Sequence, residues 1–352
     1  MGALNERHPL WSKLSFGTLG TIVNKGRILI TGAAGFVGSR ITSMLLESNF
    51  SVIGIDNLNN YYSPELKHHR LEVLTKHPQF KFLEVDIENR TQLNEIFAQS
   101  NIETVFNLAA RAGVRQSLKE PQIYFSTNTL GTLNILEAMK DNNCPQLVQA
   151  STSSLYAGSE GPFTEDLPVN RPISPYAASK KAAEVLAYTY SHLYNINVSI
   201  VRYFTVYGPA GRPDMSYLRF INNIDHGKVI KLYGDGNQSR DFTYVDDIAR
   251  GTILAGSAKQ PYEVYNLGGG KEPVSINTLI HLIEKTLGKK AIIEYSPHAQ
   301  GDMEFTMADI TKAKKMLNWT PEISLQRGIE ITVDWYQKNR DLVSKVIANE
   351  VQ

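Results

Sequence analysis

The sequence predicts an α/β fold in which a doubly wound parallel sheet is joined to a smaller, interleaved α/β lobe. Short aliphatic runs, typical of strands buried on both faces, alternate with longer segments in which apolar residues recur at helical spacing. This alternation favours a parallel sheet that is covered by helices on both faces. The 352 residues are ample for a buried core of that size.

The order of the expected elements follows the chain from residue 26 onward. We expect strands at 27–31, 51–55, 80–85, 103–108, 146–150 and 197–203, and helices near 91–99, 121–142 and 174–194. In sheets of this class, ligands bind beyond the carboxyl ends of the strands, where the strand order reverses. Residues just after each strand are therefore the first candidates for a site.

Three glycines stand where the first strand turns into a helix. They are Gly32, Gly35 and Gly38, in a G-x-x-G-x-x-G pattern. Glycines at such a turn let the backbone approach a pyrophosphate, and the helix N-terminus offers free N–H groups. The second strand ends at Asp56, whose carboxylate can accept a hydrogen bond from a ribose hydroxyl and would repel a 2′-phosphate. The pattern predicts a Rossmann-type dinucleotide-binding domain that prefers NAD to NADP.

Composition narrows the possible partners. The chain has 36 Lys and Arg against 35 Asp and Glu, a formal charge of +1, so nothing indicates nucleic acid or a membrane surface. Residues 1–25 are too interrupted for a membrane span, and we expect an arm that packs on the body or on a partner subunit. The single Cys144 excludes an internal disulfide and suits the cytoplasm, and the eight His residues show no metal-ligand spacing.

A hydroxyl-rich stretch, "ASTSSLYAG", occupies residues 150–158. Its composition alone is typical of a flexible linker. However, it begins at the end of an expected strand of the sheet, and strand ends are where such folds place their chemistry. The stretch therefore fits a surface that holds a polyhydroxylated substrate.

Tyr176 and Lys180 lie four residues apart at the start of an expected helix, so they share one face. Lowering the pKa of a tyrosine by about three units requires roughly 4 kcal/mol of bias toward phenolate, which an ammonium group and a nicotinium ring can supply. A Y-x-x-x-K pattern alone is equally typical of a solvated helix face. Together with a dinucleotide-binding turn on the same sheet, it predicts a proton-transfer pair.

With these motifs the chain resembles the extended short-chain dehydrogenase/reductase family, and within it the nucleotide-sugar epimerases, from Gly32 to about Asp302. The phrases "GIDNLNNYYSPELKHHRL", "AARAGVRQSL", "RPISPYAASKKAAE" and "RYFTVYGPAGRPDM" are most similar to those of epimerases acting on UDP-uronates. The resemblance implies tightly bound NAD, a UDP-sugar substrate and 4-epimerisation of UDP-glucuronate to UDP-galacturonate through a 4-keto sugar, without decarboxylation.

The resemblance also implies roles for individual residues. Tyr176 would be the general base and acid, Thr152 would bridge it to the sugar O4, and Lys180 would hold the nicotinamide ribose and acidify the phenol. The positions implied to contact the cofactor are Gly32, Gly35, Phe36, Val37, Gly38, Asp56, Asn57, Asp86, Ile87, Ala109, Ala110, Tyr176 and Lys180. Those implied to bind the diphosphate or the uridine ribose are Arg212, Arg240 and Asp302.

A uronate carries a hazard, because a 4-keto uronate is a β-keto acid and loses its carboxylate readily when that C–C bond stands perpendicular to the carbonyl plane. We expect Ser153, Ser154 and Thr205 to hold the carboxylate near that plane by charge-assisted hydrogen bonds. Related decarboxylases carry Glu at the position of Ser154, and many epimerases of neutral sugars carry Asn at the position of Thr205. Arg115 is a rival anchor for the carboxylate, or else pairs with surface acids or cofactor phosphates.

Other activities stay open at this point. Within the family they are a UDP-uronate decarboxylase and a 4-epimerase of UDP-glucose or UDP-N-acetylhexosamine. A non-catalytic NAD-sensing regulator of the same fold could dispense with Thr152, Tyr176 or Lys180, and the presence of all three argues against it.

The expected domain organisation is interleaved. The NAD-binding domain takes 26–204, with 240–265 returning to it, and the UDP-sugar-binding lobe takes 205–239 and 266–340, followed by a C-terminal tail at 341–352. Apolar residues on more than one face of the helices at 121–142 and 174–194 favour a homodimer interface, as the resemblance also implies, although burial within one subunit would give the same pattern. Ala210 departs from the family pattern, which usually has a larger residue there.

Overall fold

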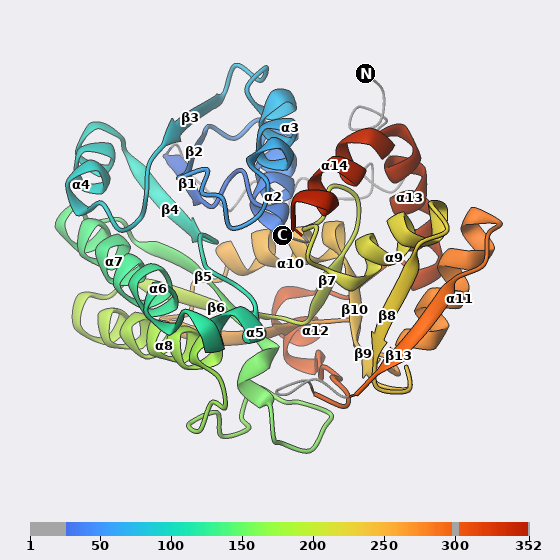
Figure 1. Cartoon of the computed structure of the whole chain (residues 1–352). Coiled ribbons are helices and arrows are strands. Elements are labelled where there is room, and N and C mark those ends of the chain that lie inside the picture. The colour runs from blue at the N-terminus through green and yellow to red at the C-terminus, as the bar shows by residue number, and fades with distance from the viewer. Residues whose placement is uncertain (1–25, 298–302, 351–352) are drawn as a thin grey trace.

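The computed structural model describes residues 26–297 and 303–350, so the expected N-terminal arm and Asp302 lie outside the described residues. A seven-stranded parallel sheet forms the centre of the larger lobe (Figure 1). From one edge to the other its strands are β11 (Tyr262–Leu267), β6 (Asn197–Tyr203), β5 (Gln146–Thr152), β4 (Ile102–Asn107), β1 (Arg27–Thr31), β2 (Val52–Asp56) and β3 (Phe80–Glu84). The order reverses between β1 and β4, as in a doubly wound sheet. The predicted fold class is confirmed.

Helices cover both faces of this sheet. Helices α2 (Phe36–Glu47), α3 (Pro64–Leu74) and α10 (Val245–Gly256) belong to one face, and α4 (Arg90–Gln99), α7 (Gly131–Asp141) and α8 (Pro175–Tyr194) belong to the other. Strand β1 shows why its aliphatic run is continuous: Ile28 and Ile30 enter the first core, whereas Leu29 enters the second. A strand buried on both faces has no polar alternation.

The helix expected across 121–142 is divided into three parts. A short helix, α6 (Pro121–Phe125), continues into the π-helical turn η2 (Ser126–Leu130) and then into α7. In the π turn, the Asn128 side chain accepts from Arg111 N at 2.8 Å and donates to Arg111 O at 2.9 Å and to Ser179 Oγ at 2.9 Å. The turn therefore ties α8 to the loop after β4. Single π turns inside helices are frequent at functional sites.

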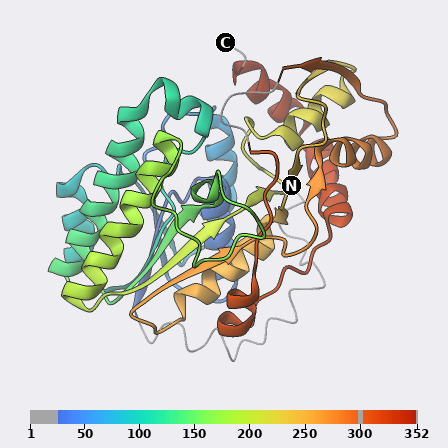
Figure 2. The ribbon, with the colours of Figure 1, turned by 90° about the horizontal axis from the view of Figure 1, so that it is seen from below.

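The smaller lobe is built from later segments of the chain and lies beside the sheet in yellow to red (Figure 2). Its elements are β7 (Thr205–Tyr207), α9 (Ser216–Asp225), β8 (Val229–Tyr233), β9 (Ser239–Arg240), β10 (Phe242–Tyr244), β12 (Val274–Ser275), α11 (Ile276–Leu287), β13 (Ile292–Ser296), α13 (Leu325–Lys338) and α14 (Arg340–Glu350). Between them the chain returns to the larger lobe through α10 and β11, and the helix α12 (Thr311–Leu317) packs on both of these elements. The expected C-terminal tail overlaps α14, in which Val343 and Val346 are buried. In the described part of the chain, no helix combines the length and apolar character needed to cross a bilayer.

Candidate active site

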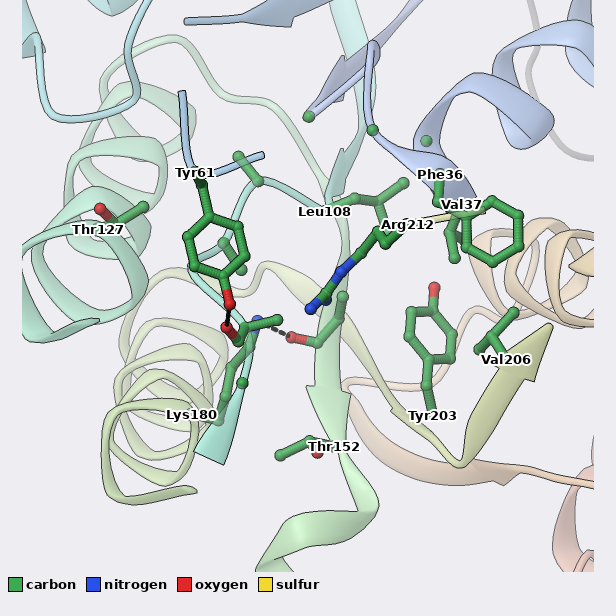
Figure 3. Close-up of a pocket in the computed structure, with 18 of the residues that line it drawn as sticks. Phe36, Val37, Tyr61, Leu108, Thr127, Thr152, Lys180, Tyr203, Val206 and Arg212 are labelled. Atoms are coloured by element: carbon green, nitrogen blue, oxygen red, sulfur yellow. Dashed lines mark hydrogen bonds between the residues drawn. The ribbon is translucent and has the colours of Figure 1, made fainter. Parts of the chain in front are cut away.

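A cavity of about 440 Å³ opens at the reversal point of the sheet, where the ends of β1 and β4 separate. Both lobes contribute to it: the loops after β1, β2, β3, β4 and β5 form one wall, and residues 203–206 with Arg212, Asp214 and Met215 form the other. Figure 3 shows Arg212 and Tyr61 pointing into this cavity from opposite walls. Clefts of this size at a reversal point are the usual ligand sites of doubly wound sheets.

The glycine turn leaves room for a pyrophosphate. Gly32 has a φ of +68°, and Gly35, which caps α2, donates from its N–H to Gly32 O at 2.9 Å. A Cβ at Gly38 would lie 2.1 Å from Gly32 O, so a side chain there would force the turn open. The backbone thus presents the unpaired N–H groups of α2 to the cavity, which fits the diphosphate of a dinucleotide.

Asp56 ends β2 and is held in place by its surroundings. Its carboxylate accepts from Ala34 N at 3.2 Å and from Leu58 N at 2.9 Å, and Lys67 Nζ on α3 lies 3.3 Å from Oδ1. Burial lowers the pKa of Lys67, and the Asp56 carboxylate opposes that shift. Lys67 reduces the net negative charge at this end of the cavity, and sequence reasoning did not single it out.

The remaining residues predicted to contact the cofactor also line the cavity. Asn57 Nδ2 donates to Asp86 Oδ2 at 2.7 Å, which joins the loops after β2 and β3. Ala109 N donates to Thr31 Oγ1 at 3.0 Å, which holds the loop after β4 against β1. The structure brings together all thirteen predicted positions: Gly32, Gly35, Phe36, Val37, Gly38, Asp56, Asn57, Asp86, Ile87, Ala109, Ala110, Tyr176 and Lys180.

Tyr176 and Lys180 enter the cavity from the first turns of α8. The helix begins there because Pro175 occupies its first turn and Ser174 Oγ accepts from Ala177 N at 3.2 Å. Lys180 is buried, and its ammonium donates to Ala150 O at 2.9 Å, a bond that Figure 3 draws as a dashed line. Burial lowers the pKa of Lys180 to about 8, and the nearby Glu184 carboxylate opposes this shift.

The phenol of Tyr176 is half-buried beside Thr152. Burial raises the pKa of Tyr176, and both the Thr152 hydroxyl and the Arg212 charge act against that rise. Thr152 ends β5, and its Oγ1 accepts from Ser154 N at 3.1 Å. Without a bound cation the phenol is therefore protonated at neutral pH, and the positive charge of an oxidised nicotinamide is the group that would favour phenolate.

A buried ion pair supports this corner of the site. Glu184, one helical turn after Lys180, accepts two bonds of 2.9 Å from Arg202 on β6 and one of 2.7 Å from Ser151 Oγ. The third Arg202 nitrogen donates to Tyr156 Oη at 2.8 Å. The hydroxyls of Ser151 and Tyr156 are therefore occupied within the protein, and those of Thr152, Ser153 and Ser154 stay at the cavity wall.

The residues predicted to contact the substrate divide into two groups. Ser153, Ser154, Thr205 and Arg212 line the cavity, and Arg212 pairs with Asp214, with Nε and Oδ1 3.0 Å apart. Arg115 lies outside the lining, with its guanidinium 4.6 Å from the centre of the Tyr233 ring.

Arg240 also lies outside the lining, and donates to Ser239 O at 2.9 Å.

Several lining residues were not among the predicted site residues, although most of them lie in the stretches that resemble the family. The ring of Tyr61 lies 5.7 Å from the Arg212 guanidinium, and its phenol donates to Ala112 O, so it spans the mouth between the two lobes. Lys67, Tyr62, Thr127, Tyr203, Asp214 and Met215 also line the cavity.

Comparison with known proteins identifies a family and relatives that the chain resembles. The model of a family described as "NAD dependent epimerase/dehydratase family" matches residues 28–268. A "UDP-glucuronate 4-epimerase" of Thermodesulfobacterium geofontis is 54% identical over 321 residues, which cover 91% of this chain and 99% of that relative. "Protein CapI" of Staphylococcus aureus is 40% identical, with 88% and 98% covered.

Solved structures of 4-epimerases are also similar to this chain. The UDP-glucuronic acid 4-epimerase of Bacillus cereus, crystallised with UDP-glucuronic acid and NAD, superposes with a TM-score of 0.84 at 39% identity, covering 89% of this chain and 99% of that one. The UDP-glucose 4-epimerase of Thermotoga maritima, solved with UDP-glucose, gives a TM-score of 0.82 at 32% identity, with the same coverage. These relatives match about nine tenths of this chain, the family model matches more than half of it, and the chain belongs to the NAD dependent epimerase/dehydratase family.

Proposed function

We propose that this chain converts UDP-glucuronate and UDP-galacturonate into each other by NAD-dependent epimerisation at C4. One observation carries the proposal: a single cavity combines the dinucleotide turn, the Thr152–Tyr176–Lys180 group and three uncharged hydroxyls at Ser153, Ser154 and Thr205. The related proteins named for this reaction, and the complex with UDP-glucuronic acid and NAD, support it.

In this proposal Tyr176 and Thr152 transfer protons, and Lys180 supplies a positive charge. Tyr176, as phenolate, accepts the proton of the sugar O4 directly or through Thr152, and later returns it. Bound NAD supplies a hydride acceptor that oxidises C4 to a ketone and returns the hydride to its other face, with no net redox change. Lys180, fixed to Ala150 O, keeps its charge near the phenol and holds the nicotinamide ribose.

The diphosphate end of the substrate is assigned to the smaller lobe. Arg212 is the cavity-lining cation of that wall, and a guanidinium can bind phosphate oxygens in two places at once. Arg240 and Asp302 remain proposed contacts for the uridine diphosphate. Arg240 lies outside the cavity lining, so its contact requires a substrate that extends beyond the cavity along β9.

The test is to incubate the purified protein with UDP-glucuronate without added NAD, following products by proton NMR and trapping carbon dioxide. We expect UDP-galacturonate without gas, which also requires that NAD co-purifies. Release of carbon dioxide with a UDP-pentose would show a decarboxylase instead. No turnover even with added NAD, combined with turnover of a neutral UDP-hexose, would overturn the choice of substrate.

We also propose a homodimer in the cytoplasm, where NAD is available and a buried free Cys144 stays reduced. The helices α6 and α8 pack side by side, and their outer surface exposes large apolar side chains. Val185, Tyr188 and Leu193 on α8 are 53%, 54% and 58% exposed, and Leu130 of the adjoining π turn is 55% exposed. Large apolar side chains exposed together are unfavourable in a monomer, and a second copy of the chain would bury them.

The dimer is tested by light scattering coupled to size-exclusion chromatography. Val185→Asp places a charge in the patch and should yield monomers, whereas the control Val229→Asp, at an exposed valine of β8, should leave the mass unchanged. A wild-type protein of monomer mass would contradict the proposal.

A further inference from the structure

Arg70 on α3 is a buried cation whose hydrogen bonds all go to neutral oxygens. Its Nε donates to Ala210 O at 3.0 Å; Nη1 donates to Ala34 O at 2.9 Å and to Tyr62 Oη at 2.6 Å; Nη2 donates to Ala210 O at 2.8 Å and to Gly211 O at 3.3 Å. Five bonds use all five N–H donors of a guanidinium. Arg70 is only 3% exposed, and among residues 26–297 and 303–350 no carboxylate accepts a hydrogen bond from it.

These bonds join two loops that come from different lobes. Ala34 belongs to the glycine turn, and its own N–H donates to the Asp56 carboxylate. Ala210 and Gly211 immediately precede Arg212 in the other wall of the cavity. A continuous path of backbone and hydrogen bonds therefore runs from the acid at the ribose end of the cofactor site, through Arg70, to the cation of the substrate wall.

The loop on the substrate side depends on this contact. Ala210 has a φ of +52°, a left-handed conformation that residues with a Cβ rarely adopt. Its carbonyl receives two of the five bonds, so Arg70 holds the peptide in that orientation. Gly211 follows under equal constraint, because a Cβ there would lie 1.6 Å from Tyr217 Oη. Together the two residues set the direction in which Arg212 leaves the backbone.

We propose that Arg70 is a positioning residue that couples the two halves of the site, so that NAD at the glycine turn and the nucleotide diphosphate at Arg212 each favour binding of the other. The proposal rests on the proposed function, since it takes a UDP-sugar to be the second ligand. Two features support it. A ligand that fixes either loop also fixes the shared guanidinium, and each diphosphate brings negative charge toward a cation that pairs with no carboxylate in the described part of the chain.

The test measures how fast radiolabelled NAD leaves the holoenzyme in an excess of unlabelled NAD, with and without saturating UDP. Wild-type enzyme should release NAD at least about fivefold more slowly when UDP is bound. In Arg70→Lys, which has three donors for the four acceptor atoms, we expect a ratio below about two. The control His68→Ala, at an exposed position of the same helix, should keep the wild-type ratio.

A second variant separates positioning from a general loss of stability. Glycine adopts the left-handed conformation without strain, so adding Ala210→Gly to Arg70→Lys should restore UDP affinity, measured by calorimetry, by about fivefold. A variant that was merely less stable would show no such rescue. Absence of rescue would overturn the route through Ala210.

The outcomes distinguish this inference from the proposed function. If UDP does not bind wild-type holoenzyme, the proposed substrate class fails and the coupling fails with it. If UDP binds and slows NAD release equally in wild type and Arg70→Lys, only the coupling is overturned. If Arg70→Lys does not fold, Tyr62→Phe, which removes the 2.6 Å bond alone, takes its place; an unchanged ratio in that variant overturns the inference.

Discussion

Ser151 Oγ donates a hydrogen bond of 2.7 Å to Glu184 Oε1, which joins the end of β5 to α8 one turn beyond Lys180. Lys180 itself donates to Ala150 O, the residue before Ser151, at 2.9 Å. Strand and helix are thus connected twice within two residues of Thr152. The distance between the proposed base on α8 and the hydroxyl of Thr152 on β5 is set by these two connections.

Removal of the Glu184 charge should destabilise the protein strongly. Glu184→Gln leaves Arg202 buried without a counter-ion, and breaking such a pair typically costs about 3–5 kcal/mol in the free energy of unfolding. Ser151→Ala removes only one hydrogen bond to the carboxylate and should cost about 1.5–3 kcal/mol. Urea unfolding followed by circular dichroism measures both. The exposed pair of Arg327 and Glu330 provides the control, because Glu330→Gln should leave the curve unchanged; equal stability of Glu184→Gln and wild type would contradict the prediction.

The stability of the NAD-free protein should depend on pH through Lys180. Burial lowers the pKa of Lys180 from 10.5 to about 8, so between these values the unfolded chain binds more protons than the folded one. Stability therefore rises with pH across this window, and below pH 8 the full burial penalty is present. Relative to Lys180→Met, the free energy of unfolding of wild type should therefore increase by about 3 kcal/mol from pH 8 to pH 10.5. Parallel curves for the two proteins would show that Lys180 titrates normally.

Local patterns in the sequence identified the NAD half of the site. Gly32, Gly35, Gly38 and Asp56 have fixed spacing because one strand, one turn and one helix place them, and each element can be read from its own residues. Tyr176 and Lys180 are adjacent on one helix for the same reason. The other expected cofactor positions, such as Asp86 and Ala109, came from the family resemblance, and all thirteen line one cavity.

Contacts between the lobes could not be predicted in this way. Arg70 reaches Ala210 only because α3 packs against a loop 140 residues away. Within the larger lobe, Lys67 on the same helix reaches Asp56 because α3 packs near the end of β2. The π turn at Ser126–Leu130 was also missed, since one extra residue in a helical turn hardly changes the apolar pattern. Arg115 carried a charge that suited the substrate, but it lies outside the cavity, against Tyr233.

Tyr176→Phe should abolish turnover while leaving the ligands bound. The ring still fills its place beside Tyr124, 6.1 Å between ring centres, but no group remains to accept the O4 proton. Loss of a general base typically lowers the rate by about 10²–10⁴-fold. The measurement is the rate of UDP-galacturonate formation, together with the NAD content of the purified protein, which should not change. Tyr295→Phe, at a 60% exposed tyrosine of β13, is the matched control; a Tyr176→Phe enzyme with more than about a tenth of wild-type activity would exclude Tyr176 as the base.

The ratio of carbon dioxide to epimer tests whether the hydroxyls protect the substrate carboxylate. Ser153 and Ser154 lie in the turn η3 (Ser153–Tyr156) directly after Thr152, Thr205 begins β7 opposite them, and all three line the cavity. Each charge-assisted bond that keeps the carboxylate near the plane of the C4 ketone is worth about 1.5–3 kcal/mol. Its loss should raise the ratio about tenfold or more, because the carboxylate can then reach the perpendicular geometry in which decarboxylation is fast.

We expect this increase for Ser153→Ala, Ser154→Ala and Thr205→Ala measured singly, and no change for Ser159→Ala, which lies just beyond the turn and outside the cavity lining. If all three variants give the wild-type ratio of carbon dioxide to epimer, the carboxylate is held by another group. Arg212, the cation on the wall that also carries Thr205, then becomes the residue to test.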